Sequence, residues 1–508
     1  MASPPPSTIL WLRRDLRLHD NPALAAALRA ATSAGSALLP FYVWDDETAT
    51  QARPGAAASW WLCHSLATLE GHLSQRGSRL LVRRGLATAV LLDTARRTCA
   101  DTIVWAAGAD PPQRAEDEAV TAALRAAGIE PRLIPGAARL VDRGDVRTRA
   151  GGPFKVFTPF WRACLERPVG AAPLAAPRAL PPAPLHPATS DLGALRDTCV
   201  PRWAVGFTDV WEPGEAGASA RLARLLSDIL GEYEAARERP DLPGTSRLSP
   251  HLHWGEISPR QVRRAVDDHV ERCEMGSCPS APGAGLRAAA KAFLRQLFWR
   301  EFAHHVLDAH SDLATAPLDQ RFAALPWRDP VRDPVAAADL AAWQRGRTGY
   351  PLVDAGMREL WTTGWLHNRV RMVCGSFLVK HLLLPWQYGE TWFWDTLVDA
   401  DAANNAFGWQ WIAGCGADAA PYFRIFSPML QGDRYDQQGD YVRRWVPELA
   451  GLPQRWLNRP WEAPRHVLSE AGVKPGETYP SPIVDHAVAR ARALDAFATA
   501  RTRPHQGS

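Results

Sequence analysis

Hydroxyl side chains and an arginine lie together in the segment GTSRLSP, residues 244–250. Thr245, Ser246 and Ser249 offer hydroxyl and backbone N–H donors beside a predicted helix start, and Arg247 adds a positive charge. Donors of this kind at the N-terminus of a helix suit a pyrophosphate group. Taken alone, the segment is also typical of an ordinary helix cap, so the pattern leaves both interpretations open.

Two acidic residues and two amides lie close together further along the chain. Asp399 and Asp401 flank a single alanine just before Asn404 and Asn405. Acids at this spacing are typical of a solvated loop or a helix cap. The spacing alone therefore assigns no chemistry to these four residues.

Tryptophan is unusually frequent in this chain. There are 22 tryptophans, and 14 of them lie at or beyond Trp254. A large aromatic core would account for them. The alternative is that some of them serve base stacking or electron transfer.

Several segments together resemble the DNA photolyase/cryptochrome family, and class I cyclobutane pyrimidine dimer photolyases most of all. The resemblance covers nearly the whole chain, and the order and spacing of the segments fit the family. The segments are WLRRDLRLHDNPAL, KVFTPFW, GTSRLSPHLHWGEISPRQ, LFWREF, RGRTGYPLVDAGMREL, GWLHNRVRM, FWDTLVDADAANN and GWQWIAGCGADAAPYFRIFSP.

This resemblance implies that the chain binds FAD. In the family pattern Asp399 pairs with Arg371 beside the flavin ring, and Asn405 faces the flavin N5 atom, where an amide can tune the cofactor. The full set of implied FAD contacts is Tyr233, Thr245, Ser246, Arg247, Leu248, Ser249, Phe293, Arg371, Asp399, Asp401 and Asn405.

The resemblance also assigns an electron-transfer role to three tryptophans, which would photoreduce the resting flavin. Trp409 would lie next to FAD, Trp386 in the middle and Trp327 at the far end. The chain carries a few extra residues between Trp327 and Trp343, which departs from the usual spacing.

A pyrimidine dimer cannot be reached inside a duplex, so photolyases flip it into a pocket. The resemblance implies that Trp299 and Trp411 stack on the lesion and that Asn368 and Met372 face it. It implies phosphate contacts from the arginines, which suit phosphate oxygens. These arginines are Arg237, Arg369 and Arg424.

One position of the lesion pocket departs from the expected pattern. Many photolyases specific for cyclobutane dimers have a glutamate where this chain has Gln296, which can still donate and accept hydrogen bonds but carries no charge. Phe293, where a tryptophan is common, is a milder change. We interpret both as a loss of repair efficiency and not as a change of lesion.

Three functions follow from the resemblance. We expect a deoxyribodipyrimidine photo-lyase that repairs cyclobutane dimers in UV-damaged DNA. The alternative is a cryptochrome-type blue-light sensor without repair, motivated by Gln296; the short C-terminal tail argues against it. Repair of (6-4) lesions is disfavoured, because His367 is followed by Asn368 and not by a second histidine.

The resemblance further implies a second, light-harvesting chromophore in the N-terminal half. Folate sites in the family often use an Asn and a Glu after the fourth strand. Here Ala106, Ala107 and Gly108 stand where polar or basic residues are common, and Asp110 is the candidate to replace the glutamate. A folate, a deazaflavin, a flavin and an empty site all stay open.

The composition excludes several protein classes. No stretch approaches the roughly 20 apolar residues of a membrane span, and we see no signal peptide, so we expect a cytoplasmic protein without membrane association. Cys273 and Cys278 are the only close cysteine pair and lack further ligands at zinc spacing, so we expect no metal site. Nothing in the sequence requires more than a monomer, and the net charge of +4 says little about partners.

The hydrophobic patterning predicts the elements that position these residues. Short apolar runs alternate with helical patterns over residues 1–140, which predicts a doubly wound parallel sheet. A proline-rich connector lies at 168–187, within an expected inter-domain linker at 141–215. Helical patterns dominate 216–490, including one amphipathic helix through residues 219–239, and we expect an all-α FAD-binding domain there. Residues 491–508 are expected to be a tail.

Overall fold

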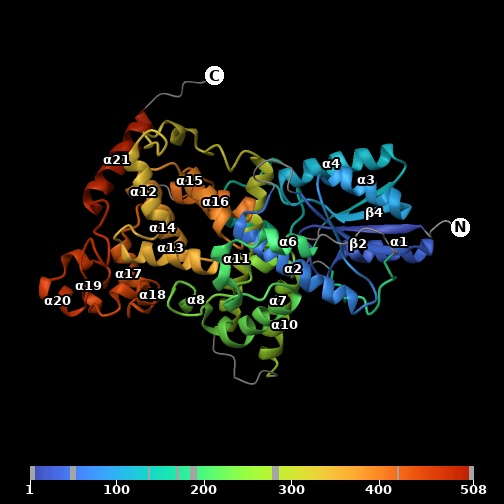
Figure 1. The fold of residues 1–508 in the computed structure, drawn as a ribbon, viewed down its shortest axis with the longest axis horizontal. Coiled ribbons are helices and arrows are strands. Elements are labelled where there is room, and N and C mark those ends of the chain that lie inside the picture. The colour runs from blue at the N-terminus through green and yellow to red at the C-terminus, as the bar shows by residue number, and fades with distance from the viewer. Residues whose placement is uncertain are drawn as a thin grey trace.

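The computed structural model describes residues 6–45, 53–135, 138–167, 171–183, 192–276, 285–419 and 423–502. A parallel sheet with its covering helices forms one half of the molecule, and a larger all-helical assembly forms the other (Figure 1). This arrangement confirms the predicted fold class. Within the described part of the chain, no helix combines the length and apolarity needed to cross a membrane.

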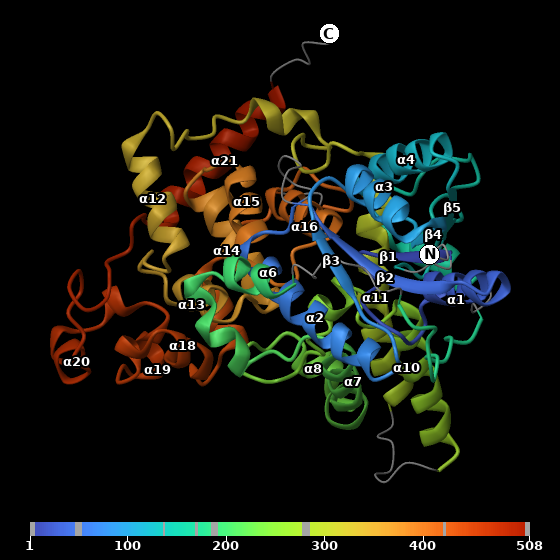
Figure 2. The same ribbon diagram turned by 45° about the vertical axis from the view of Figure 1, so that its right-hand side comes forward.

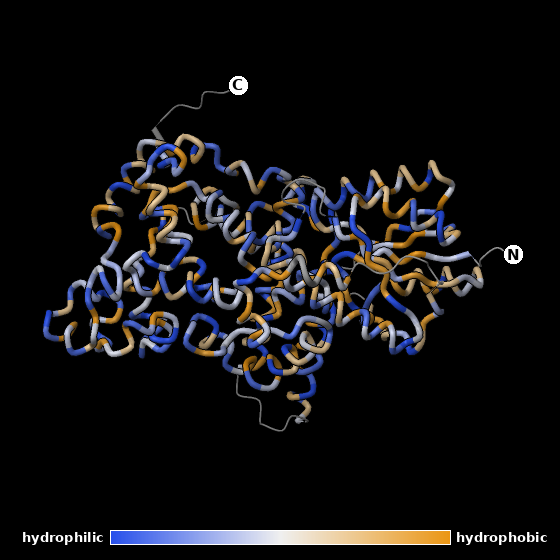
Figure 3. The backbone as a smooth tube through the Cα atoms, viewed as in Figure 1, coloured by the Kyte–Doolittle hydropathy of each residue, from blue (hydrophilic) through white to orange (hydrophobic). Residues whose placement is uncertain are grey.

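The sheet contains five parallel strands in the order β3-β2-β1-β4-β5. Its central strand, β1, is buried at all six positions, because helices cover both faces of a doubly wound sheet. The inner strands β2 and β4 accordingly carry apolar runs, whereas the edge strands β3 and β5 include charged residues (Figure 3). The strands are β1 (Ser7–Leu12), β2 (Ala37–Trp44), β3 (Leu81–Arg84), β4 (Ala100–Ala106) and β5 (Glu130–Ile134).

Two helices cover each face of the sheet. Helices α1 and α2 pack on one face, and α3 and α4 on the other. Asn21 caps α1 by accepting from the backbone N–H of Leu24, and Asp110 caps α4 in the same way at Gln113. The helices are α1 (Pro22–Ala34), α2 (Ala56–Ser74), α3 (Ala87–Thr98) and α4 (Pro111–Ala126).

The segment expected as a linker, 141–215, contains helical structure. Its longest helix is α5 (Phe157–Leu165), followed by α6 (Leu192–Cys199) and the 3-10 helix η2 (Arg202–Asp209). Helices α2 and α6 lie between the sheet and the helical half (Figure 2). The described part of the proline-rich connector, 171–183, has no regular secondary structure.

The helical half forms one large hydrophobic core with smaller clusters beside it. Its elements are α7 (Glu215–Arg224), η3 (Leu225–Ile229), η4 (Leu230–Glu232), α8 (Tyr233–Ala236), α9 (Ser249–His253), α10 (Pro259–Glu274), α11 (Leu286–Ala309), η5 (Gln320–Ala324), α12 (Pro334–Gln344), α13 (Pro351–Thr363), α14 (Asn368–Ser376), η6 (Phe377–His381), α15 (Trp386–Thr396), α16 (Ala402–Ala413), α17 (Pro428–Tyr435), α18 (Asp440–Trp445), η7 (Pro447–Leu449), α19 (Gln454–Leu457), η8 (Pro460–Glu462), α20 (Arg465–Glu470) and α21 (His486–Thr502).

Two sequence-based expectations about this half were wrong. The single helix predicted through 219–239 is interrupted: α7 passes into a π-helical turn and a 3-10 turn before α8 begins at Tyr233. The expected tail is helical up to Thr502, because α21 buries Ala493 and Ala496 in the core and stacks Phe497 on Phe423 with ring centroids 4.5 Å apart. Residues 503–508 lie outside the described residues.

The two halves are joined by a segment that follows β1. The guanidinium of Arg17, which is buried, donates to the carbonyl of Gly255 at 2.8 Å. Asp20 accepts from Ser258 and Arg260 at the start of α10. Gly255 has a φ of +68°, and a Cβ there would lie 2.0 Å from the carbonyl oxygen of Arg14. This close approach therefore requires glycine.

Candidate functional site

An arginine–carboxylate pair lies at the centre of the helical half. Arg371 on α14 donates through Nη2 to Asp399 at 2.8 Å, and Ser249 donates its hydroxyl to the same carboxylate at 2.6 Å. The Nε of Arg371 donates to the carbonyl of Leu366 at 2.7 Å, which fixes the guanidinium plane. The side chain of Asp399 is only 4% exposed. Three segments far apart in the sequence therefore meet at one buried charge pair.

An amide and a carboxylic acid lie side by side on the neighbouring helices α15 and α16. The Nδ2 of Asn405 donates to the carbonyl of Glu390 at 3.0 Å and to its Oε1 at 2.9 Å. Burial raises the pKa of Glu390 to about 7. Among the described residues no donor reaches the Oδ1 of Asn405, so this acceptor is available to a bound group.

Glu390 was missed at the sequence level. The buried positions of α15 include Trp386, Gly389, Glu390 and Phe393, which is the spacing of an apolar helix face. An acid inside such a face must find a partner or become protonated. That signal could have identified it.

Asp401 caps α16 and contacts two histidines. Its Oδ1 accepts from the backbone N–H of Asn404 at 2.9 Å, and Nδ1 of His253 lies 3.4 Å from its Oδ2. His304 on α11 lies 3.7 Å from its Oδ1. Burial would raise the pKa of Asp401, but these imidazoles hold it well below its usual range. Asp401 is thus a buried acceptor at a helix start.

The segment expected to bind pyrophosphate leads into a very short helix. Helix α9 begins at Ser249, as the sequence predicts, but has only five residues. Arg247 has a φ of +51°, and its guanidinium lies over the ring of Trp365 at 4.5 Å. Burial lowers the pKa of Arg247, and the nearby Glu359 opposes this effect. Thr245, Ser246 and Leu248 belong to the same turn, in which the N–H of Leu248 faces the hydroxyl of Ser246 at 3.4 Å.

Tyr233 and Phe293 form an aromatic wall between α8 and α11. Their rings meet edge to face with centroids 5.3 Å apart, and both side chains are buried. Residues of both helices share one hydrophobic cluster with Leu248.

The three candidate electron-transfer tryptophans pack in one hydrophobic core. Trp409 and Trp386 are buried, and Trp327 is partly buried against the same cluster. A Cβ on Gly389 would lie 2.1 Å from the Trp409 ring, so α15 and α16 approach closely there. The N–H of Arg328 donates to the carbonyl of Leu383 at 2.9 Å, which holds the Trp327 segment beside the start of α15. The ring centroids of Trp343 and Trp409 lie 6.2 Å apart.

The residues expected to face the lesion lie on α11, α14 and α16. Gln296 and Trp299 are three residues apart on α11, and Trp299 stacks on Phe157 with centroids 3.7 Å apart. The ring centroid of Trp299 also lies 6.1 Å from that of Phe407 on α16. These contacts hold the indole plane between two other segments. The other residues expected at the lesion are Asn368 and Met372 on α14 and Trp411 on α16. The Asn368 amide nitrogen lies 3.8 Å from the Met372 sulfur. The Nε1 of Trp411 donates to the backbone carbonyl of Asp418 at 3.1 Å.

Two of the three arginines expected to contact phosphate share an acid that we did not single out from the sequence. Arg369 donates to Glu238 through Nε at 2.7 Å and also through Nη2. The Nε of Arg237 donates to the other oxygen of Glu238 at 3.1 Å. Arg424 is exposed in a separate loop, which the buried Lys380 holds by donating to its carbonyl at 2.9 Å.

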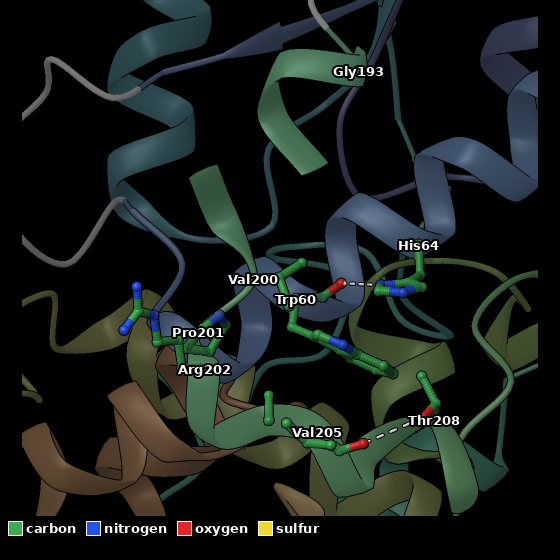
Figure 4. Close-up of a pocket in the computed structure, with 9 residues that line it drawn as sticks. Trp60, His64, Gly193, Val200, Pro201, Arg202, Val205 and Thr208 are labelled. Carbon is green, nitrogen blue, oxygen red and sulfur yellow. Dashed lines mark hydrogen bonds between the residues drawn. The ribbon is translucent and has the colours of Figure 1, made fainter. Parts of the chain in front are cut away.

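A cavity of about 590 Å³ lies between α2 and η2, on the side of the α/β half (Figure 4). It is lined by Trp60 and His64 from α2 and by Val200, Pro201, Arg202 and Val205. His64 Nδ1 lies 2.8 Å from the carbonyl of Trp60. The segment 105–114, which contains the candidate antenna residue Asp110, does not line this cavity. The carboxylate of Asp110 pairs with Arg14 at 2.9 Å.

No group of three or more metal-ligating side chains occurs in the parts of the chain that the structure describes. Cys278 lies outside these parts, so the expectation about the Cys273 and Cys278 pair is not tested.

The buried polar groups fit the expected flavin. Arg371 and Asp399 form a charge pair, and Asn405 has an unused amide oxygen. The turn around Arg247 adds a positive charge. A flavin needs such hydrogen-bonding groups at its ring edge and cations near its phosphates. The donor set therefore matches the group.

Comparisons with known proteins agree on one family. Residues 8–182 match the DNA photolyase family, and residues 293–499 match the FAD binding domain of DNA photolyase. The chain is 43% identical to the deoxyribodipyrimidine photo-lyase of Agrobacterium fabrum, covering 97% of this chain and 98% of that one. It is 37% identical to cryptochrome-1 of Arabidopsis thaliana, covering 96% of this chain and 70% of that one.

A solved structure is similar over almost its full length. It is a bacterial class III photolyase from Agrobacterium tumefaciens, with a TM-score of 0.89, 42% identity and 99% of each chain covered. Sequence, fold and site chemistry thus point the same way, and the chain belongs to the DNA photolyase/cryptochrome family.

Proposed function

We propose that this protein repairs cyclobutane pyrimidine dimers in DNA with blue light. When bound, reduced FAD supplies an electron to the dimer and takes it back after the ring has split, so there is no net redox change. The observation that carries the proposal is the contact between Trp299 and Phe407. This contact supports the proposal because an aromatic side chain that could stack on a flipped base lies against α16, two residues from Asn405 and its unused amide oxygen.

The chain's own residues would divide the work between cofactor and lesion. Arg371, Asp399 and Ser249 would orient the flavin, and Asn405, held by Glu390, would accept a hydrogen bond from its edge. The turn around Arg247, with Tyr233 and Phe293, would enclose the rest of the cofactor. Trp409, Trp386 and Trp327 would conduct electrons that return the resting cofactor to its reduced state.

The lesion would lie between Trp299 and Trp411, near Gln296, Asn368 and Met372. Stacking on an aromatic side chain stabilises an extruded base by about 1–3 kcal/mol, which offsets part of the cost of flipping. Gln296 on α11 can donate a hydrogen bond to the dimer without carrying a charge. The class I assignment stays a prediction, because the similar solved structure is described as a class III photolyase.

The cavity lined by Trp60 supports a second chromophore. Its volume of about 590 Å³ is in the range of ligand sites, and an indole, an imidazole and an arginine suit a planar anionic ring system. Folate, deazaflavin and flavin all have this chemistry. Arg202→Ala should release the second chromophore while FAD stays bound, as judged by absorption spectra of the purified protein. Arg224→Ala, an exposed arginine on α7, is the matched control.

The decisive experiment is light-dependent repair of defined lesions. Photoreduced protein is mixed with one oligonucleotide carrying a cyclobutane thymine dimer and another carrying a (6-4) lesion, and intact thymine is quantified after blue light and in darkness. We expect recovery from the cyclobutane dimer alone, and only in light. Recovery from neither lesion, with FAD bound and photoreducible, would reject the repair proposal.

A light-sensing role without repair is the second candidate. The 37% identity to a plant cryptochrome favours it, as does Gln296 in place of an acid. The same assay separates the two functions, because a pure sensor photoreduces its flavin but leaves both lesions intact.

A further inference from the structure

Glu238 lies between two arginines that come from different parts of the fold. It follows α8 in the sequence, and its two carboxylate oxygens accept from Arg237 and from Arg369 on α14. The side chain of Glu238 is 32% exposed, and those of Arg237 and Arg369 are 20% and 16% exposed. The acid therefore lies at the surface, not in the core.

Other groups hold this cluster in place. The guanidinium of Arg369 lies over the ring of Tyr435 at 4.4 Å, and that of Arg237 lies near the ring of Tyr233 at 5.6 Å. The guanidinium of exposed Arg434 also lies 5.1 Å from the centroid of the Tyr435 ring. His367, which caps α14, is buried and has its pKa lowered to about 4 by burial, so it adds no positive charge at neutral pH. Glu238 is thus one acid that contacts two arginines.

A carboxylate in this position presents to the arginines what a DNA phosphate would present. Both are anions with oxygens that match the donor fork of a guanidinium. The Nε and Nη2 donors of Arg369 are already occupied by Glu238. A phosphate that approaches these arginines must share or replace the carboxylate.

We propose that Glu238 is an internal competitor for DNA phosphate that weakens binding to undamaged DNA and thereby makes tight binding depend on the lesion. The inference rests on the proposed function, in which Arg237 and Arg369 face DNA. Undamaged DNA gains phosphate contacts almost alone, so an internal anion reduces its affinity strongly. A duplex with a flipped dimer loses affinity by the same factor but also gains contacts in the lesion pocket, so it still binds tightly.

The test compares Glu238→Gln with Glu234→Gln. Glu234 lies exposed on α8, one turn before Glu238, and its replacement changes the net charge equally. Binding of the flavin-loaded protein to an undamaged duplex and to the same duplex with one cyclobutane dimer is measured in the dark over a range of salt concentrations. Glu238→Asp, which keeps the charge, is the rescue variant.

We expect Glu238→Gln to bind undamaged DNA about 3–10-fold more tightly, with a salt dependence steeper by about one phosphate contact. Binding of the damaged duplex should tighten by a similar factor, while Glu234→Gln stays near the wild type and Glu238→Asp recovers most of the wild-type salt dependence. Unchanged or weaker binding of undamaged DNA by Glu238→Gln would overturn the proposal, as would an equal gain in Glu234→Gln.

The readout keeps this proposal separate from the proposed function. A wild-type protein that shows no preference for the dimer and no repair in light contradicts the repair function. Competition by Glu238 is judged on undamaged DNA alone, by the difference between the two glutamine variants. A solely structural role of Glu238 would lower flavin content or thermal stability without steepening the salt dependence.

Discussion

Two arginine–carboxylate clusters of this protein have the same chemistry and different surroundings. Asp399, paired with Arg371, has a side chain only 4% exposed, whereas Glu238, paired with Arg369, is 32% exposed. Water and salt therefore screen the carboxylate of the second pair more than that of the first, although the two arginines, Arg371 at 24% and Arg369 at 16% exposed, are similarly accessible. A buried pair that loses one partner leaves an uncompensated charge, whereas an exposed acid can be exchanged for another anion. The first cluster is therefore suited to hold a cofactor permanently, and the second to bind DNA reversibly.

The largest expected effect comes from breaking the buried pair. Arg371→Met leaves Asp399 without its cation, and we expect a loss of roughly 3 kcal/mol in the free energy of unfolding together with loss of flavin. Urea denaturation and the flavin absorption of the purified variant measure both. Arg358→Met is the control, because Arg358 pairs with the more exposed Glu448 and should cost only about 1 kcal/mol. Equal losses in the two variants would remove the distinction between buried and exposed clusters.

The second prediction concerns Glu390, the buried acid beside Asn405. Its pKa is about 7 in the folded protein against 4.5 ordinarily, so the unfolded chain releases the proton first as the pH rises. Stability should therefore fall between about pH 4.5 and 7 and level off above, by roughly 2–3 kcal/mol. Glu390→Gln should flatten this part of the pH profile measured by denaturation. An unchanged profile would show that Glu390 is ionised throughout this range.

The third prediction concerns Arg369, an arginine that pairs with Glu238. Arg369→Ala removes one phosphate contact, so DNA affinity should fall about tenfold and the salt dependence should become shallower by about one contact. This is the opposite of the result expected for Glu238→Gln. Arg332→Ala serves as the control, because the Arg332 side chain is 89% exposed in the segment before α12. A change of affinity without a change of salt dependence would argue against a phosphate contact.

The smallest expected effect is at Gln296. Gln296→Glu restores the acid common at this position, and we expect the yield of repair per absorbed photon to rise by less than about tenfold, since one hydrogen bond contributes about 1 kcal/mol net. Actinometry during repair of a thymine-dimer oligonucleotide measures the yield. A loss of yield would mean that this pocket is adapted to the neutral amide.

The sequence predicted the α/β half well and the helical half less completely. Continuous apolar runs such as Thr8–Leu12 identify buried parallel strands directly, because every position must be apolar. The interruption between α7 and α8 was not predicted, because it consists of five residues of π-helix and three of 3-10 helix, too few to change the periodicity of the whole segment. The helix α21 was missed because its buried positions are alanines, such as Ala493 and Ala496, which give a weak amphipathic signal.

Pairs between distant segments were predictable only through the family resemblance. The contact of Arg371 with Asp399 joins positions 28 residues apart, and that of Arg369 with Glu238 joins positions 131 residues apart. Hydrophobic periodicity carries no information about such partners. Glu390 was detectable in principle, because it lies within a buried helix face. Glu238 could not have been singled out from the sequence, because an acid beside an arginine at a protein surface is common.

The N-terminus of α2 has a consequence for energy transfer. A Cβ on Gly55 would lie 2.1 Å from the carbonyl oxygen of Trp394, and the N–H of Ala56 donates to Asp395 at 2.9 Å. The helix that lines the Trp60 cavity is thus docked directly on α15, which carries Trp386 and Glu390. The rate at which an excited dye passes its energy to an acceptor depends steeply on distance and on the angle between their transition dipoles. For a dye in that cavity, the docking of α2 on α15 would fix both the distance and the angle. A single methyl group added at Gly55 would clash with Trp394 and change both.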